Sequence, residues 1–122
     1  MISEGQSATI SFDVTQAATA AALGSGDVEV LGTPKIVALA EEAAVAAIAG
    51  SVPDDSTTVG TNVTIDHLLP SQIGATVHAS ATVTSVDGRR VGFAVQIREG
   101  DATVARGTHQ RVVVERSRFL PS

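Results

Sequence analysis

The sequence predicts an α+β fold in which one long apolar helix packs against an antiparallel sheet of at least five strands. Residues 34–49 form an Ala-rich run of helical length that begins at Pro34 and stops before Gly50. After residue 57, apolar and polar residues alternate with the period of two that strands require. The length of 122 residues suits one domain, which we expect to span residues 1–122.

The composition favours an oligomer. Hydrophobic residues make up 43% of the chain, but aromatic residues only 2%, with no Trp or Tyr. The core must therefore be built from Val, Ile, Leu and Ala, which bury little area each. A chain of this size buries only about two thirds of its unfolded surface. Burial of a further face against a second copy of the chain would add stability.

The charge and the cysteine count exclude several classes of function. A net charge of −5 argues against nucleic acid as a partner, because phosphate binding needs a basic patch. The four C-terminal arginines, at positions 106, 111, 116 and 118, are too sparse to reverse this. The absence of cysteine excludes a disulfide, a thiolate nucleophile and a Cys-based zinc site, and we predict no metal site.

The N-terminal sequence and the hydropathy predict a cytoplasmic protein. The first ten residues have neither the basic region nor the apolar region of a signal peptide. No apolar run in the sequence is long enough to span a membrane. We therefore expect no membrane partner.

The N-terminal third predicts one strand, an ambiguous segment and the helix. Residues 8–14 alternate as a half-buried strand does. Residues 15–27 are Ala-rich and end in a Gly-Ser-Gly run, which fits either a short helix or a loose flap over a site. A short extended piece then leads to Thr33, a good N-cap, and to Pro34, which suits the first helical position.

The remaining chain predicts four strands, mainly within residues 58–115. The first, near residues 58–67, places Val59 in phase with the apolar positions that follow and with His67 at its end. In the second, His78 alternates with the apolar residues and belongs to the polar face. Asp87-Gly88 signals a hairpin, and a further turn at residues 99–101 leads to a last strand that ends near Glu115. This order of elements is that of a single-domain hot-dog fold, a curved antiparallel sheet wrapped around one long central helix.

Two adjacent glutamates on the helix face different surroundings. At 100° per residue, Glu42 falls about 20° from Lys35, and the two mark a solvent-facing edge. Glu41 lies about 100° away, on a side that should face the sheet or a partner. The other members of that side are Val37, Val45 and Ile48. A carboxylate there is costly unless it is paired or hydrogen-bonded. Glu41 therefore sits at the edge of the apolar stripe, pairs with an arginine across a dimer contact, or is functional.

Further polar residues allow both structural and functional interpretations. Thr33 is a helix cap or a catalytic hydroxyl, and His67 is a core histidine or points into a pocket. His109 shares one side of the last strand with Arg111, where small residues indicate a cleft or a subunit contact. A hydroxyl, a carboxylate and an imidazole are the ingredients of acyl transfer and hydrolysis. The backbone at the helix start or at Gly60 could stabilise an oxyanion.

Four segments carry a more specific signal: "GTPKIVALAEEAA", "TTVGTNVTIDHLLPSQIG", "VDGRRVGFAVQIREG" and "RGTHQRVVVERSRF". In this order and spacing they resemble the fluoroacetyl-CoA thioesterase-like family of hot-dog proteins, from about Val30 to Phe119. The resemblance implies a homodimer with two active sites at the subunit interface. It also implies hydrolysis of an acyl-CoA thioester, with coenzyme A as part of the substrate and no other cofactor.

The resemblance also implies roles for individual residues. The family's catalytic threonine, glutamate and histidine match Thr33, Glu41 and His67. Its glycine that contacts the acyl group matches Gly60, and the arginine of its terminal motif matches Arg111. The sequence reads "GTHQR" where the family often has "GTHER", so position 110 departs from the pattern.

The resemblance says less about which acyl group the substrate carries. The fluoroacetyl-specific members carry an aromatic gate before the helix, whereas "GSGDVEVLG" has no aromatic residue, so we expect a small to medium acyl group. We hypothesise that Glu41 acts as general base or nucleophile in thioester hydrolysis. Thr33 shares this role or orients the reacting groups, and His67 assists proton transfer to the leaving thiolate or orients water. Two alternatives are a non-catalytic hot-dog module that binds an acyl-thioester or small hydrophobic ligand, and a hot-dog dehydratase or hydratase, in which Thr33 would be superfluous.

Overall fold

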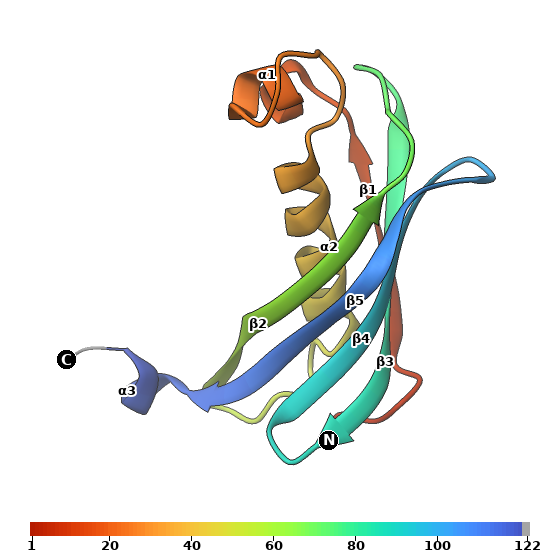
Figure 1. The fold of residues 1–122 in the computed structure, drawn as a ribbon. Helices are drawn as coiled ribbons and strands as arrows, with labels where there is room; N and C mark the ends of the chain where they lie inside the picture. Colours follow the sequence, from red (N-terminus) through yellow and green to blue (C-terminus); the bar gives the residue numbers. More distant parts are fainter. Residues whose placement is uncertain (121–122) are drawn as a thin grey trace.

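In the computed structural model, which describes residues 1–120, five antiparallel strands form one sheet that curves around a central helix (Figure 1). The spatial order of the strands is β1-β3-β4-β5-β2. Their bounds are β1 (Ser7–Asp13), β2 (Ser56–His67), β3 (Thr76–Asp87), β4 (Arg90–Glu99) and β5 (Ala102–Glu115). The predicted α+β hot-dog architecture is confirmed.

The central helix is α2 (Thr33–Ala47), and its start corrects one prediction. Gly32, not Thr33, is the N-cap, and no side chain caps the helix. Gly32 has extended backbone, and its carbonyl accepts the first helical hydrogen bonds, so Thr33 and Pro34 become the first two helical residues. The Thr33 hydroxyl is thereby free for a partner outside the helix.

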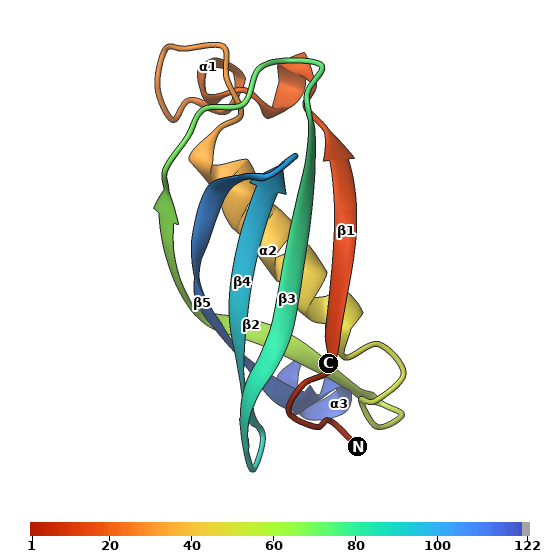
Figure 2. The same ribbon diagram turned by 90° about the vertical axis from the view of Figure 1, so that its right-hand side faces the viewer.

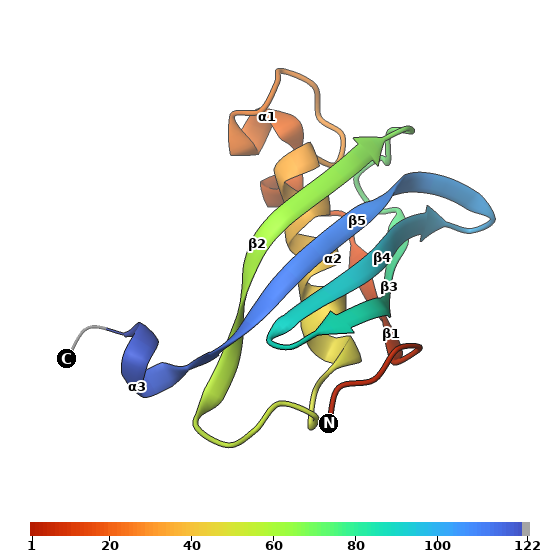
Figure 3. The same ribbon diagram turned by 60° about the horizontal axis from the view of Figure 1, so that its bottom comes forward.

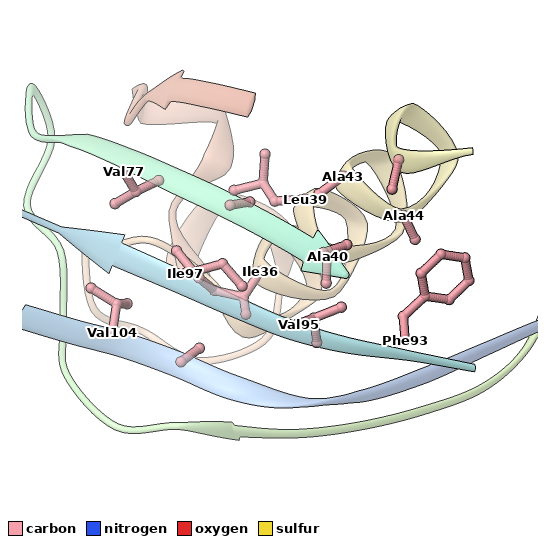
Figure 4. Close-up of a cluster of buried hydrophobic side chains, with 14 of the residues drawn as sticks. Ile36, Leu39, Ala40, Ala43, Ala44, Val77, Phe93, Val95, Ile97 and Val104 are labelled. Atoms are coloured by element: carbon pink, nitrogen blue, oxygen red, sulfur yellow. The ribbon is translucent and has the colours of Figure 1, made fainter. Parts of the chain in front are cut away.

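The buried face of α2 is dominated by alanine, which lets the helix lie close to the sheet (Figure 4). Its buried residues are Ile36, Leu39, Ala40, Ala43, Ala44 and Ala47. The predicted apolar faces of β3 and β4 pack opposite this helix. Their buried members are Val77, Ala79, Ala81, Val83, Val91, Phe93, Val95 and Ile97. The alternation that predicted these two strands is confirmed.

A β-bulge in β2 overturns the predicted face of Val59. Gly60 pairs with Arg111 and Val63 pairs with His109, but the register shifts between Gly60 and Asn62. Paired residues of an antiparallel ladder share a face of the sheet, so Gly60 and Val63 face the same way although they are three apart. Val59 therefore lies on the opposite face, because the extra residue of the bulge reverses the alternation.

The segment before α2 covers the N-terminal end of the helix (Figure 2). It contains the short helices η1 (Gln16–Ala18) and α1 (Ala20–Leu23), which resolves the ambiguity of residues 15–27. Isolated bridges join Thr19 to Leu31 and Val30 to Gln72, so this cover is tied to the loop between β2 and β3. A last short helix, α3 (Arg116–Phe119), follows β5.

Strand β2 is one edge of the sheet (Figure 3). Helix α2 packs chiefly on β1 and β3, which are remote from that edge in the strand order. The concave surface of β5 and β2 therefore lies beside the helix and is less covered by it. No helix within residues 1–120 is both long enough and apolar enough to cross a membrane.

Candidate active site

The first residue of α2 and the last residue of β2 form a hydrogen-bonded pair. The hydroxyl of Thr33 and Nδ1 of His67 lie 2.7 Å apart. Burial lowers the pKa of His67 from its usual value of 6.5, so the imidazole is neutral at pH 7. Its other nitrogen, Nε2, is buried and makes no hydrogen bond within residues 1–120. A neutral imidazole beside a hydroxyl is suited to accept the hydroxyl proton.

Thr33 and His67 open onto a pocket of about 380 Å³. One wall is α1 and the segment that follows it, and the other is the start of the loop between β2 and β3. The remaining lining residues are Ala20, Ser25, Gly26, Asp27, Val28, Val30, Leu31, Leu68, Leu69 and Pro70. None of these residues is aromatic and several are aliphatic, so the pocket offers an apolar surface next to the Thr33 hydroxyl.

Glu41 belongs to a second group, at the middle of α2. Its Oε2 lies 3.3 Å from Nη1 of Arg111 and 4.0 Å from Nε2 of His109. The Glu41 side chain is 38% exposed, whereas His109 is 2% exposed. An arginine thus pairs with the carboxylate, but it belongs to the same chain, whereas the sequence suggested an arginine across a dimer contact. Its neighbour Glu42 is exposed, as predicted.

Arg111 is held from several sides. Its Nε donates to the Thr58 hydroxyl (2.9 Å) and its Nη2 to the Thr58 carbonyl (3.0 Å). Nη1 contacts both Glu41 and Nε2 of His109, the latter at 3.1 Å. Burial lowers the pKa of Arg111, but a guanidinium keeps its charge in proteins. With most of its donors occupied and only 7% of its surface exposed, Arg111 lies behind Glu41 rather than beside the pocket.

Gly60 leaves the space that the carboxylate of Glu41 occupies. A Cβ atom at this position would lie 2.5 Å from Oε2 of Glu41 and 3.1 Å from Cε1 of His109. Gly60 pairs with Arg111 in the ladder, so the position of its missing Cβ lies on the same face as Arg111 and next to Glu41. A side chain is excluded here, and Glu41 stays accessible from the edge of the sheet.

The residues singled out in the sequence therefore form two groups within one chain. Thr33 and His67 are in contact, and Glu41 lies with Gly60 and Arg111. Thr33 and Glu41 are eight residues apart on α2, or about 12 Å along the helix axis. His109, which was predicted only to lie at a cleft or subunit contact, belongs to the Glu41 group. His109 and Arg111 are two residues apart in a strand, and this spacing predicted that both lie on the same face of the sheet.

The outer face of the sheet carries a separate set of polar groups. Nδ1 of His78 lies 2.9 Å from the Ser11 hydroxyl, and His78 is exposed, as predicted. A hollow of about 510 Å³ on this face includes Gln96 and Arg106, but neither Thr33 nor Glu41. Within residues 1–120, no cluster of three or more His, Asp or Glu side chains could hold a metal ion.

The arrangement of the five strands around α2 is that of the hot-dog proteins. The crystal structure of a hot-dog-like protein from Thermanaerovibrio acidaminovorans matches with a TM-score of 0.84 and 23% identity, over 98% of this chain and 94% of that one. The chain belongs to the fluoroacetyl-CoA-specific thioesterase (FlK) family, whose model matches residues 14–117.

Two members of this family can be compared in detail. The fluoroacetyl-CoA thioesterase of Streptantibioticus cattleyicolor is 33% identical over 91 residues, which are 75% of this chain and 66% of that protein. A crystal structure of an FlK variant in complex with fluoroacetate and CoA is 29% identical, with a TM-score of 0.91, and the match covers 98% of this chain and 100% of that one.

Proposed function

We propose that this protein hydrolyses an acyl-CoA thioester with a small to medium acyl group to the free acid and CoA. The observation that carries the proposal is the Thr33 hydroxyl on the neutral imidazole of His67, at the mouth of an apolar pocket. Membership of the FlK family, and the fluoroacetate and CoA bound to a relative, support the choice of a CoA thioester. No metal or further cofactor is part of the proposal, and we place the enzyme in the cytoplasm.

In the proposed reaction, Thr33 and His67 handle the protons at the thioester. The hydroxyl of Thr33 donates to Nδ1 of His67 and orients the attacking oxygen. The oxygen that bonds to the thioester carbonyl carbon comes from water, or from the carboxylate of Glu41, in which case water then hydrolyses the resulting anhydride. As that bond forms, the carbon–sulfur bond breaks and the thiolate of CoA leaves, and the proton lost by the water passes through the base and His67. His67 passes a proton to that thiolate. With Nδ1 accepting from Thr33, the ring proton of the neutral imidazole stands on the buried Nε2, beside the backbone of Leu69.

Glu41 supplies the base or nucleophile, and we propose that it does so across a homodimer interface. Within one chain, about 12 Å of helix separates it from Thr33. Glu41 points toward the open side of α2, along with Val37, which is half-buried, and Val45, which is 46% exposed. The free edge of β2 lies on the same side, and unpaired edges are suited to strand pairing. A second copy paired there would bring Glu41 of one subunit toward Thr33 and His67 of the other.

Gly60 and Arg111 complete the proposed site. The backbone N–H of Gly60 polarises the carbonyl oxygen, next to the carboxylate of Glu41 that occupies the space of the missing side chain. Arg111 holds the carboxylate of Glu41 in place and contributes positive charge to the substrate site. The acyl group enters the pocket beside Thr33, where Val28, Leu68 and Leu69 provide apolar contacts.

The pairing of Thr33 with His67 favours hydrolysis over hydration or dehydration. A hot-dog dehydratase or hydratase pairs its histidine with a helix carboxylate. In this chain the imidazole of His67 also contacts the hydroxyl of Thr33, which that chemistry does not require.

The test is release of free thiol from short, branched and aromatic acyl-CoA substrates, followed with a thiol-reactive dye. Turnover of at least one substrate supports the proposal. If no substrate of the panel releases thiol but the same compounds bind tightly, the proposal is overturned in favour of a non-catalytic binding module.

A mixing experiment tests the shared site separately. Thr33→Val and Glu41→Gln subunits, combined by reversible denaturation, should give hybrids with one intact site of two. About half of the dimers are hybrids after random assortment, so about a quarter of the wild-type activity should return. No recovery would place all of the catalytic groups of a site in one chain.

A further inference from the structure

His109 is held in one tautomer by its two hydrogen-bond partners. Its Nδ1 lies 2.7 Å from the carbonyl oxygen of Asn62, which can only accept a hydrogen bond, so Nδ1 carries a proton. Its Nε2 lies 3.1 Å from Nη1 of Arg111, which can only donate, so Nε2 carries none. Both partners therefore require the same neutral imidazole.

The surroundings of the ring keep it neutral. His109 is 2% exposed, and its ring stacks on that of Phe93 in β4, with centroids 5.9 Å apart. The charged groups that face it are Arg111 on its own strand and Glu41 on α2. Burial lowers the pKa of His109, and the charge of Arg111 lowers it further against the opposing effect of Glu41.

We infer that His109 is a positioning residue, a neutral acceptor that directs Nη1 of Arg111 toward Glu41. This inference rests on the proposed function, in which Glu41 is a reacting group. Nη1 carries two N–H groups, and the acceptor at Nε2 engages one of them while the other is directed at Oε2 of Glu41. If the acceptor is lost, this side of the guanidinium is free to turn away from the carboxylate.

Protonation of His109 would have the same effect as its removal. A second N–H at Nε2 would point at the N–H groups of Arg111, so two cations would stand 3.1 Å apart. Arg111 and His109 would separate, and the cationic ring, whose Nε2 lies 4.0 Å from Oε2 of Glu41, would compete with Arg111 for the carboxylate. Arg111 stays charged at every pH of interest, so the state of His109 decides whether this contact holds.

Two variants separate positioning from space filling. His109→Phe keeps a ring against Phe93 but has no acceptor, whereas His109→Gln can place a carbonyl oxygen near the position of Nε2. We expect kcat to fall on the order of 10-fold in His109→Phe, since one hydrogen bond to a charged group is lost, with KM little changed. His109→Gln should recover most of that loss. Equal activity of wild type and His109→Phe, or equal loss in both variants, would overturn the inference.

A spectroscopic test does not depend on activity. In protein labelled with ¹⁵N-histidine, the ring signal that disappears in His109→Gln belongs to His109. At pH 7 it should show one protonated and one unprotonated nitrogen, and Arg111→Lys should shift the unprotonated one. A cationic ring, or a proton on Nε2, would overturn the inference even if thioesters are hydrolysed. The expected tautomer with no turnover of any thioester would instead count against the proposed function alone.

Discussion

The hydroxyl of Thr33 and the carboxylate of Glu41 stand on the same helix but contact different strands. Thr33 meets His67 at the end of β2, and Glu41 meets Arg111 in the middle of β5. Two turns of α2 keep them apart, about 12 Å along the helix axis. This relationship leads us to place the complete site between two subunits.

Glu41 should be essential for turnover and dispensable for the fold. Glu41→Gln keeps the volume of the side chain and an oxygen for Arg111, but it removes the base or nucleophile. We expect kcat to fall by about 10²-fold or more, with an unchanged circular dichroism spectrum. Glu42→Gln is the matched control, because Glu42 is the exposed neighbour on the same helix. Wild-type turnover in Glu41→Gln would remove it from the mechanism.

Thr33 and His67 should act as one unit. Thr33→Val and His67→Gln each break the same 2.7 Å contact, so the double variant should be no slower than the worse single variant. Each should lower kcat by about 10²-fold, while Thr33→Ser should retain most activity because it keeps the hydroxyl. A four-way cycle of kcat/KM measures the coupling, and independent, additive losses would show that the pair does not work together.

Gly60→Ala should disturb the Glu41 group. The new Cβ would lie 2.5 Å from Oε2, so the carboxylate must move. We expect a loss of about 1–3 kcal/mol in the free energy of unfolding, as for other overpacked sites, together with reduced kcat. Thr64→Ala, at an exposed position of the same strand, should change neither. In the background of Glu41→Ala the stability cost of Gly60→Ala should shrink, and an undiminished cost would mean that the carboxylate is not what obstructs the Cβ.

Stability should decline on mild acidification. Burial lowers the pKa of His67 and His109 in the folded state, whereas the unfolded chain takes up protons near the usual value of 6.5. The free energy of unfolding is therefore highest above the usual value of 6.5 and falls as the pH drops below it, because the unfolded chain takes up protons before the folded chain does. Thermal melts above and below this pH test it. His109→Gln should flatten the decline and His78→Gln, at an exposed position, should not.

The open side of α2 should be required for self-association. A lysine in place of Val45, which is 46% exposed beside Glu41, would place a charge in the proposed interface. We expect Val45→Lys to convert dimer to monomer and to lower activity, measured by light scattering after gel filtration. Val86→Lys, at a 41% exposed valine in the hairpin between β3 and β4, is the control. A monomeric wild type, or a dimeric Val45→Lys, would contradict the interface.

The architecture could be predicted from the sequence because apolar residues recur with one period in helices and another in strands. The alternation in β3 and β4 and the long Ala-rich helix identify two packed layers before any coordinates. The phase of Val59 could not be predicted, since a bulge adds one residue without a clear signal in the sequence. The prediction that Thr33 is the N-cap was wrong because the sequence around the helix start is ambiguous. Gly32 and Thr33 can both begin a helix, and the competing partner of Thr33, His67, is remote in sequence.

The candidate site was only partly predictable. The helical wheel separated Glu41 from Glu42, because that depends on local geometry alone. The side chains that contact Glu41 depend on the register between β2 and β5. This register cannot be predicted from the residue types of either strand alone. His109 illustrates the limit: its spacing from Arg111 placed it on the right face, but its role follows from a carbonyl in another strand.

The alanines on the buried face of α2 have a consequence for how the reaction rate can change. At Ala40, Ala43 and Ala44 a single methyl group fills the space between the helix backbone and the sheet, so little room remains at these positions. One added methylene there must tilt the helix, and its two ends then move in opposite directions relative to the strands. Thr33 sits at one end and Glu41 near the centre, so the tilt would displace the hydroxyl more than the carboxylate. Substitutions at these buried alanines, which do not contact the substrate, should therefore alter the active-site geometry. Directed evolution of this enzyme should include these positions.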